Sequence, residues 1–490
     1  MSSPEPQLHG LVWVEGLWSL EPRWSVEPDI EAIKQTIQSV RPSSTLEVTL
    51  LAQGGFNKIY DVKIDNEMLI MRLALPVDPF HKTASEVATM DWIRRTTNLP
   101  VPSIISYQAS RDNLLGFEWI LMTKIPGEPL GEIWKSVSFS AKTRLVKEIA
   151  ASSACLFRNQ LRGIGNIYGT SSLVEDSAST EMSPPTTEPL DTEKSFPAKT
   201  PVSDEDSAST REKPEAPLFA SPGTGCSARA VPDVGRIVSM HFFWGSHIHQ
   251  DIYRGPFRSS KDWITARLTL SENAQRSNLA KYPAGVDLDS DGEDEVHDAK
   301  RTLQIIDKLK SLLPLVFPTN DNNPEPSMIF HDDLSRHNII VSEGGKLTGV
   351  IDWECCSALP LWKACDYPSF LEGKERREKP DIGRYYHDAN GEPDELYWEH
   401  LLEHERTIFR DLFIGDMKRV EPGWVEVFDK SEIQRDFDYA VLSCDSSFLS
   451  RPITKWIVDV TAGKDNIESL YDRDFGILKC TVSLRNLHTV

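Results

Sequence analysis

Apolar residues recur with two different periods along the chain, and the change of period separates two kinds of segment. Between residues 45 and 125, short runs either alternate apolar and polar residues or are continuously apolar, which is typical of β-strands. Gly54 and Gly55 separate the first two runs and predict a turn. We expect strands over 46–50, 59–64, 68–73 and 117–122, and one helix over 83–97. Together they predict a small mixed α/β unit.

Beyond Gly127 the apolar residues follow a helical period. We expect helices over 140–158, 260–271 and 299–313, and a β-hairpin formed by 339–341 and 347–351 around two glycines. Before residue 45, the Trp- and Pro-rich segment 11–28 predicts an extended arm that lies on a domain. Asp29 is placed to cap a helix that carries Ile30, Ile33, Ile37 and Val40 on one face.

Composition marks residues 172–230 as different from the rest of the chain. This stretch is rich in Ser, Thr, Pro and Glu, and the sequence Glu-Asp-Ser-Ala-Ser-Thr occurs at 175–180 and again at 205–210. Such a composition does not supply enough apolar surface for a core. We therefore predict a disordered insertion, and a second short insertion over 283–298.

The net charge of −21 is concentrated in the two predicted insertions, which carry −6 (counted over 172–230) and −7 (over 287–298). This acidic balance argues against nucleic acid and anionic membrane as partners. Residues 287–298 also match the first six positions of a Ca²⁺-binding loop, D-x-D-x-D-G. Asp294 and Asp298 stand where that loop has an apolar residue and a Glu, so a solvated acidic linker is the competing interpretation.

The cysteines and the apolar runs bear on the compartment. Seven scattered cysteines without a CxxC pair predict neither a disulfide framework nor a zinc site, and they favour a reducing compartment. No apolar run is long enough for a membrane helix, and the first ten residues lack a secretory pattern. We expect a cytoplasmic protein. The sequence gives no prediction of its oligomeric state.

The stretch from His331 to Asn338, followed by Asp352, carries the chemistry. It spaces a carboxylate (Asp333), an amide (Asn338) and a second carboxylate (Asp352) as phosphoryl transfer requires. Apolar strand-like residues flank it, and the predicted hairpin returns Asp352 to the end of the loop. Two other interpretations are a polar turn without chemistry and a metal phosphohydrolase that uses His331 and Asp332 as ligands. The second would need further His ligands at helical spacing, which are not evident.

The chain resembles the aminoglycoside phosphotransferase family, in particular its fungal-type members, and more distantly choline kinases and protein kinases. The resemblance covers most of 45–170 and 230–370. It is carried by six motifs, namely Gly-Gly-Phe-Asn-Lys-Ile-Tyr at 54–60, Ala-Ser-Glu-Val-Ala-Thr-Met at 84–90, Leu-Pro-Val-Pro at 99–102, Met-Thr-Lys-Ile-Pro-Gly at 122–127, His331 to Asn338, and Ile-Asp-Trp-Glu at 351–354.

The resemblance implies an α+β, two-lobed protein kinase-like fold. An arm and helix (1–44) would precede a nucleotide-binding N-lobe (45–125) and a mainly helical C-lobe (126–490) that holds the catalytic loop and the acceptor site. It also implies ATP- and Mg²⁺-dependent transfer of the γ-phosphoryl group to a hydroxyl of a small-molecule acceptor. Asp333 would be the catalytic base and Asn338 and Asp352 would hold Mg²⁺, whereas His331 would brace the loop and Asp366 would be structural.

The same resemblance assigns the nucleotide-binding residues. The turn formed by Gly54, Gly55, Phe56, Asn57 and Lys58 would approach the phosphates, since glycine lets backbone N–H groups come close. Arg72 stands where kinases carry their phosphate-binding Lys and would pair with Glu86. Thr83 and Glu86 also fit a helix capping box, which competes for Glu86. Backbone groups of Thr123 and Ile125 would face adenine.

Two other functional classes stay open at this point. One is a nucleotide-binding pseudokinase that acts as a scaffold, and retention of Asp333, Asn338 and Asp352 argues against it. The other is a protein-directed kinase, which the missing A-P-E segment after Asp352 makes less consistent with the sequence.

Overall fold

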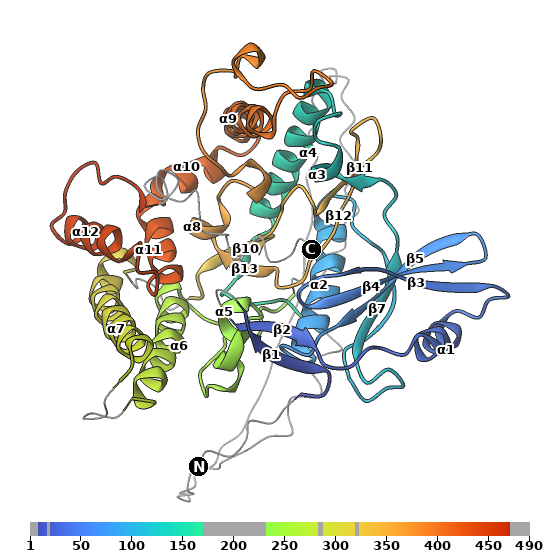
Figure 1. The fold of residues 1–490 in the computed structure, drawn as a ribbon, viewed down its shortest axis with the longest axis horizontal. Coiled ribbons are helices and arrows are strands. Elements are labelled where there is room, and N and C mark those ends of the chain that lie inside the picture. The colour runs from blue at the N-terminus through green and yellow to red at the C-terminus, as the bar shows by residue number, and fades with distance from the viewer. Residues whose placement is uncertain (1–7, 17–19, 170–231, 283–287, 319–322, 471–490) are drawn as a thin grey trace, which may run out of the picture. The chain divides into compact units, whose positions relative to one another are not determined.

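A five-stranded antiparallel sheet is the centre of the N-lobe in the computed structural model, which describes residues 8–16, 20–169, 232–282, 288–318 and 323–470. Its strand order is β3-β4-β5-β7-β6. The strands of this sheet, which Figure 1 labels in part, are β3 (Leu46–Gln53), β4 (Asn57–Ile64), β5 (Glu67–Ala74), β6 (Ile104–Gln108) and β7 (Glu118–Thr123).

Two helices cover opposite faces of this sheet, and we use "N-lobe" for β3–β7 with these helices. Helix α1 (Ile30–Val40) buries Ile33 and Ile37 against one face, and Asp29 caps it by accepting from the Glu31 N–H at 2.9 Å. Helix α2 (His81–Thr96) buries Met90 and Ile93 against the other. Because side chains alternate along a strand, Arg72 on β5 points to the α2 side, as Ile70 does.

Residues 11–24 form a hairpin rather than only an extended arm. Strands β1 (Leu11–Glu15) and β2 (Leu20–Trp24) pair antiparallel. The hairpin packs on a short helix, α5 (Met240–Phe243), and on the 3₁₀ turn η2 (Gly245–His249), with the rings of Trp13 and Trp244 5.5 Å apart. The prediction that this segment lies on a domain is confirmed, and pairing of its own backbone accounts for the added strands.

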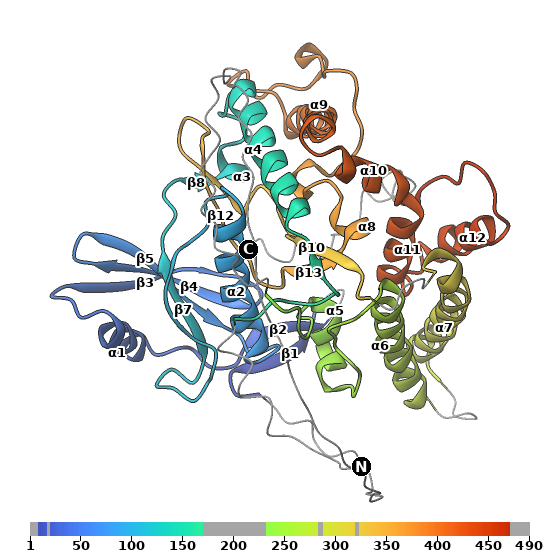
Figure 2. The same cartoon turned by 180° about the vertical axis from the view of Figure 1, so that it is seen from behind.

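The C-lobe, as we use the term, contains all described elements after β7, apart from α5 and η2. Contacts between α4 and α9, and between α6 and α7, organise its helices. Its longer helices, seen from two sides in Figures 1 and 2, are α4 (Phe139–Arg158), α6 (Ser260–Ala280), α7 (Ser290–Val316), α9 (Glu395–Val420), α10 (Pro422–Lys430), α11 (Glu432–Leu442) and α12 (Ser450–Thr461). Its short helical elements are α3 (Leu130–Ile133), α8 (Leu361–Ala364), η3 (Ser369–Leu371) and η4 (Ile382–Arg384).

Two three-stranded sheets in the C-lobe hold the catalytic-loop segment. One has the order β13-β10-β9 and the other β12-β11-β8. Their strands are β8 (Glu128–Pro129), β9 (Leu161–Arg162), β10 (Pro326–Phe330), β11 (Ile339–Val341), β12 (Leu347–Val350) and β13 (Ser357–Pro360). The predicted hairpin over 339–351 is confirmed as β11–β12. Strand β10 leads into the loop at 331–338 and β11 leaves it, so buried strands fix both ends of the loop.

The connection between the lobes is tied to this hairpin at Gly127. Strand β8 pairs with β11, and Gly127 immediately before it has φ +123°. A Cβ added to Gly127 would lie 2.3 Å from the Val341 carbonyl oxygen. Only glycine has both the backbone freedom and the space for this approach. A second glycine, Gly349 on β12, makes room for the side chain of Ile125.

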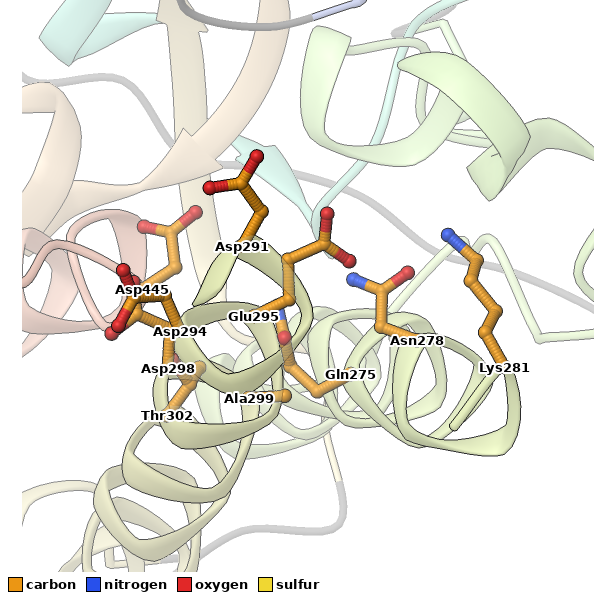
Figure 3. A pocket seen from close by; sticks show the side chains of 10 residues that line it. All are labelled: Gln275, Asn278, Lys281, Asp291, Asp294, Glu295, Asp298, Ala299, Thr302 and Asp445. Carbon is orange, nitrogen blue, oxygen red and sulfur yellow. The ribbon is translucent and has the colours of Figure 1, made fainter. Parts of the chain in front are cut away.

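The acidic segment corrects one prediction. Residues 290–298 are not a disordered insertion or a calcium loop, because they form the first turns of α7, which Asp289 caps by accepting from the Gly292 N–H at 2.9 Å. Their carboxylates line a hollow of about 620 Å³ together with residues of α6 (Figure 3). Acidic residues in a first helical turn are favoured by the helix dipole. Residues 283–287, and the insertion predicted over 172–230, lie outside the described residues.

The other predicted elements differ from the structure mainly in length. All four N-lobe strands and the helix are present, but β6, whose residues show neither alternation nor a long apolar run, was not predicted. Helix α6 continues nine residues beyond the predicted end, and α7 starts nine residues before the predicted start. In both cases the added turns are polar and mostly exposed, so the apolar period does not extend over them.

Candidate active site

Three of the predicted catalytic residues meet at the end of the β11–β12 hairpin. The Nδ2 of Asn338 donates to the backbone oxygen of Asp333 at 2.8 Å and to its carboxylate at 3.0 Å. The N–H of Ile351, next to Asp352, donates to the Asn338 carbonyl at 3.0 Å. The sequence spacing of carboxylate, amide and carboxylate therefore becomes one hydrogen-bonded frame.

Asp352 stands at a conformationally special position. Its φ of +64° lies in the left-handed region that residues other than glycine seldom adopt, and such strain is frequent at functional sites. His331 supports it from the catalytic loop, because its Nε2 lies 3.1 Å from the Ile351 carbonyl and its ring packs edge-on against Trp353. Burial lowers the pKa of His331, so a neutral ring donates this bond. The geometry matches the predicted bracing role.

The two remaining acids near the loop have peripheral places. Asp332 is exposed to solvent, in keeping with its lack of a predicted role. Asp366 is half-buried and accepts the Tyr367 N–H at 2.7 Å, which is a local turn bond.

Arg72 and Glu86 form the predicted buried ion pair. The Nη1 of Arg72 lies 2.5 Å from Glu86, and both side chains are at most 5% exposed. Helix α2 begins at His81, after Phe80, so Thr83 is already helical and the alternative capping box is wrong. Burial raises the pKa of Glu86 to about 7 against the opposing effect of Arg72. Arg72 also reaches the C-lobe, since its Nη2 lies 3.0 Å from Asp352.

Two residues that the sequence reasoning did not single out complete this cluster. Glu354 lies 2.8 Å from Arg72 and 2.5 Å from Lys82, and it accepts Asn57 Nδ2 at 3.0 Å. Burial opposes ionisation of Glu354, but Lys82 and Arg72 outweigh it and hold its pKa below the usual value. Lys82 precedes Glu86 by four residues, which places both on one face of α2 and was a usable signal.

The residues at the glycine turn separate into two groups. Gly54 and Gly55 connect β3 to β4, with the Gly54 N–H donating to the Asn57 carbonyl at 2.9 Å, and Asn57 faces the charged cluster. The side chains of Phe56 and Lys58 do not, which corrects their assignment as nucleotide-binding side chains. Phe56 is buried against Phe243, and Lys58 pairs with Glu27 because alternation along β4 turns it to the opposite face.

The predicted hinge residues differ in what their backbones offer. The N–H of Thr123 donates to the Ser103 carbonyl at 3.0 Å, so it does not face adenine, contrary to the prediction. The backbone N–H and C=O of Ile125 have no hydrogen-bond partner among the described residues. Of the two, Ile125 is therefore the residue whose backbone groups are available to a ligand.

The donor set at Asn338 and Asp352 fits Mg²⁺. This ion prefers hard oxygen ligands and commonly takes one or two from the protein. Because Asn338 Nδ2 is committed to Asp333, its oxygen is the atom left for a cation, next to a carboxylate that is 28% exposed. Within the described part of the chain, no group of three or more His, Cys, Asp or Glu residues is arranged as a metal site. The fit is therefore to a metal with few protein ligands.

Comparison with known proteins agrees with this geometry. Residues 254–363, which include the catalytic loop and Asp352, match the profile of the phosphotransferase enzyme family. This segment belongs to that family. Together with the β-rich N-lobe and helical C-lobe, the match identifies a phosphotransferase of the kinase-like type.

Relatives of this phosphotransferase are fungal. A subtelomeric hrmA-associated cluster protein of Aspergillus fumigatus is 26% identical over 362 residues, covering 66% of this chain and 60% of its own length. The chain thus spans less than two thirds of that relative. A clavilactone A biosynthesis cluster protein of Ampulloclitocybe clavipes is 23% identical and covers 74% of each chain. The mitochondrial protein altered inheritance of mitochondria 9 of Meyerozyma guilliermondii is 26% identical over 28% of this chain and 24% of its own.

Solved structures similar to this phosphotransferase include aminoglycoside 2′-phosphotransferase-IIIa with GDP (11% identity, TM-score 0.39, covering 89% of this chain and 98% of the other). Another is a thermostable APH(4)-Ia variant with AMP-PNP and hygromycin B (12%, TM-score 0.38, 88% and 99%). No helix in the described part of the chain is long and apolar enough to cross a membrane.

Proposed function

We propose that this protein transfers the γ-phosphoryl group of ATP, with Mg²⁺, to a hydroxyl group of a small-molecule acceptor. The observation that carries the proposal is the joining of two sets of residues. Asp333, Asn338 and Asp352 share one frame in the C-lobe, and the buried Arg72–Glu86 pair of the N-lobe contacts Asp352 at 3.0 Å. A base, a metal site and a phosphate-binding cation are the parts that phosphoryl transfer requires.

Asp333 would take the proton of the acceptor. As the acceptor oxygen bonds to the γ-phosphorus, the bond from that phosphorus to the bridging oxygen of ADP breaks, and the hydroxyl proton passes to the Asp333 carboxylate. The hydrogen bond from Asn338 holds this carboxylate in one orientation. Bound Mg²⁺, held by Asn338 and Asp352, would neutralise charge on the phosphates. Positioning and charge neutralisation then account for most of the catalysis.

The N-lobe would bind the nucleotide. Arg72 is anchored by Glu86, so its guanidinium is fixed and loses little entropy when it binds a phosphate. The Gly54-Gly55 turn would approach the phosphates through its backbone. The Ile125 backbone groups, at the connection between the lobes, are placed to pair with adenine.

A small acceptor is favoured over a protein. Only four residues separate Asp352 from β13, a buried strand that pairs with β10. The chain therefore has no long segment directly after Asp352 on which a protein substrate could lie. The relative named for a clavilactone A biosynthesis cluster also supports an acceptor of low molecular weight.

Release of ADP tests the proposal. The full chain is incubated with Mg²⁺, ATP and a panel of amino alcohols, sugars, aminoglycosides and amino acids. We expect acceptor-dependent ADP release, which Asp333→Asn lowers at least about 100-fold, as loss of a general base does. Asp332→Asn is the matched control, since this neighbour is exposed, and it should keep the activity. Tight ATP binding without turnover on the whole panel would instead indicate a scaffold.

A further inference from the structure

One carboxylate of the C-lobe receives three polar groups of the N-lobe. Glu354 has an 8% exposed side chain and is contacted by Lys82 at 2.5 Å, Arg72 at 2.8 Å and Asn57 at 3.0 Å. These partners come from α2, β5 and the start of β4. Glu354 is thus a point at which the two lobes register against each other, two residues after the proposed metal ligand Asp352.

Lys82 is the partner whose presence needs an explanation. Its side chain is only 2% exposed, and its other hydrogen bond goes to Asn57 Oδ1 at 2.9 Å. Enclosing an ammonium group costs free energy that only close anionic partners offset. An apolar residue would fill this place in α2 without that cost. The enclosure also keeps Lys82 from contacting a phosphate, so any effect on a nucleotide must pass through its partners.

Charge explains what Lys82 does for Arg72. The cluster contains two cations, Arg72 and Lys82, and three carboxylates, Glu86, Asp352 and Glu354. Without Lys82, Arg72 would be the one cation among three carboxylates. Its guanidinium would be held more strongly by them, and the excess negative charge would repel the nucleotide phosphates.

We propose that Lys82 is a positioning residue for phosphoryl transfer, which neutralises Glu354 and thereby leaves Arg72 available to the nucleotide phosphates. Through Asn57 it also steadies the residue that closes the Gly54-Gly55 turn. The inference rests on the proposed function, because it presumes a nucleotide on Arg72.

Binding of Mg²⁺·AMP-PNP, measured by calorimetry on the full chain, tests the inference. We expect Lys82→Met to weaken binding about 10-fold or more, at unchanged stoichiometry. In a Glu354→Gln background, the same change should weaken binding less than about 3-fold, since no carboxylate is left at 354 to neutralise. Lys63→Met is the control, because Lys63 is an exposed residue of β4, with its side chain 52% exposed, and should bind as the wild type does.

The outcomes separate the alternatives. A merely structural Lys82 would lower the unfolding free energy and leave the affinity of the folded protein unchanged, which overturns the inference. An equal loss with and without Glu354 overturns it too, because Lys82 would then act on its own. Should Lys82→Met not fold, Lys82→Gln keeps a hydrogen-bond donor for Glu354 and replaces it. A wild type that does not bind Mg²⁺·AMP-PNP contradicts the proposed function, and the inference falls with it.

Discussion

Gly127 offers a quantitative test of how the lobes are joined. Replacing it by alanine has two costs that the structure separates. A φ of +123° is open to glycine and strained for alanine by roughly 1–3 kcal/mol. The new Cβ would also lie 2.3 Å from the Val341 carbonyl oxygen and 2.9 Å from its carbon, so β11 or the connection must shift. Such overpacking adds about 1–3 kcal/mol. We expect Gly127→Ala to lower the unfolding free energy by about 3 kcal/mol or more.

Two other glycines serve as matched controls for the two costs. Gly391 has φ +83° with no atom within 4 Å of an added Cβ, so Gly391→Ala carries the strain without the clash. Gly344, in the turn of the β11–β12 hairpin, has neither. Urea unfolding should therefore rank the losses as Gly127→Ala, then Gly391→Ala, then Gly344→Ala near zero. Mg²⁺·AMP-PNP affinity should fall only for Gly127→Ala. A Gly127→Ala protein as stable as Gly344→Ala would refute the reasoning.

Two further predictions concern groups away from the candidate site. Asp438→Asn should cost about 3–5 kcal/mol in urea unfolding, because Arg267 and Lys363 lose their buried carboxylate, whereas Asp411→Asn, in an exposed pair, should cost under about 1. Burial, with Arg267 and His247 nearby, lowers the pKa of His241 to about 3 against the opposing effects of the Arg267 carbonyl and Asp438, so its unfolded state binds the proton first and stability falls as pH drops below 6.5. His241→Gln should reduce this loss by roughly 1 kcal/mol per pH unit, and exposed His297→Gln should not; equal slopes would contradict it.

The parts of the site that the sequence predicted are those encoded locally. The loop and hairpin from His331 to Asp352 are continuous in sequence, so flanking apolar residues and two glycines sufficed to bring the ends together. Arg72 and Glu86 could be paired because strand and helix periods place both on one face of the N-lobe. The same strand period, applied to β4, would have turned Lys58 away from the site.

The contacts that escaped prediction join residues far apart in the chain. Lys82 and Glu354 meet only once the lobes are assembled, and a lysine in a first helical turn is ordinarily solvated. The acidic start of α7 failed for the opposite reason. Its charges suggested a solvated linker, whereas helix capping by Asp289 and packing of the later apolar residues extend the helix into it.

The position of the charged cluster explains why it can be both buried and functional. One hydrophobic cluster continues from the α2 face of the N-lobe sheet, through Ile70 and Met90, into the C-lobe through Val350 and Trp353. Arg72, Glu86 and Glu354 border it, so their charges lie where water cannot screen them fully. Small displacements there change electrostatic energies more than they would at the surface. A site built in this way gains fixed geometry, provided that each charge has its counterpart, and Glu354 with Lys82 supplies one.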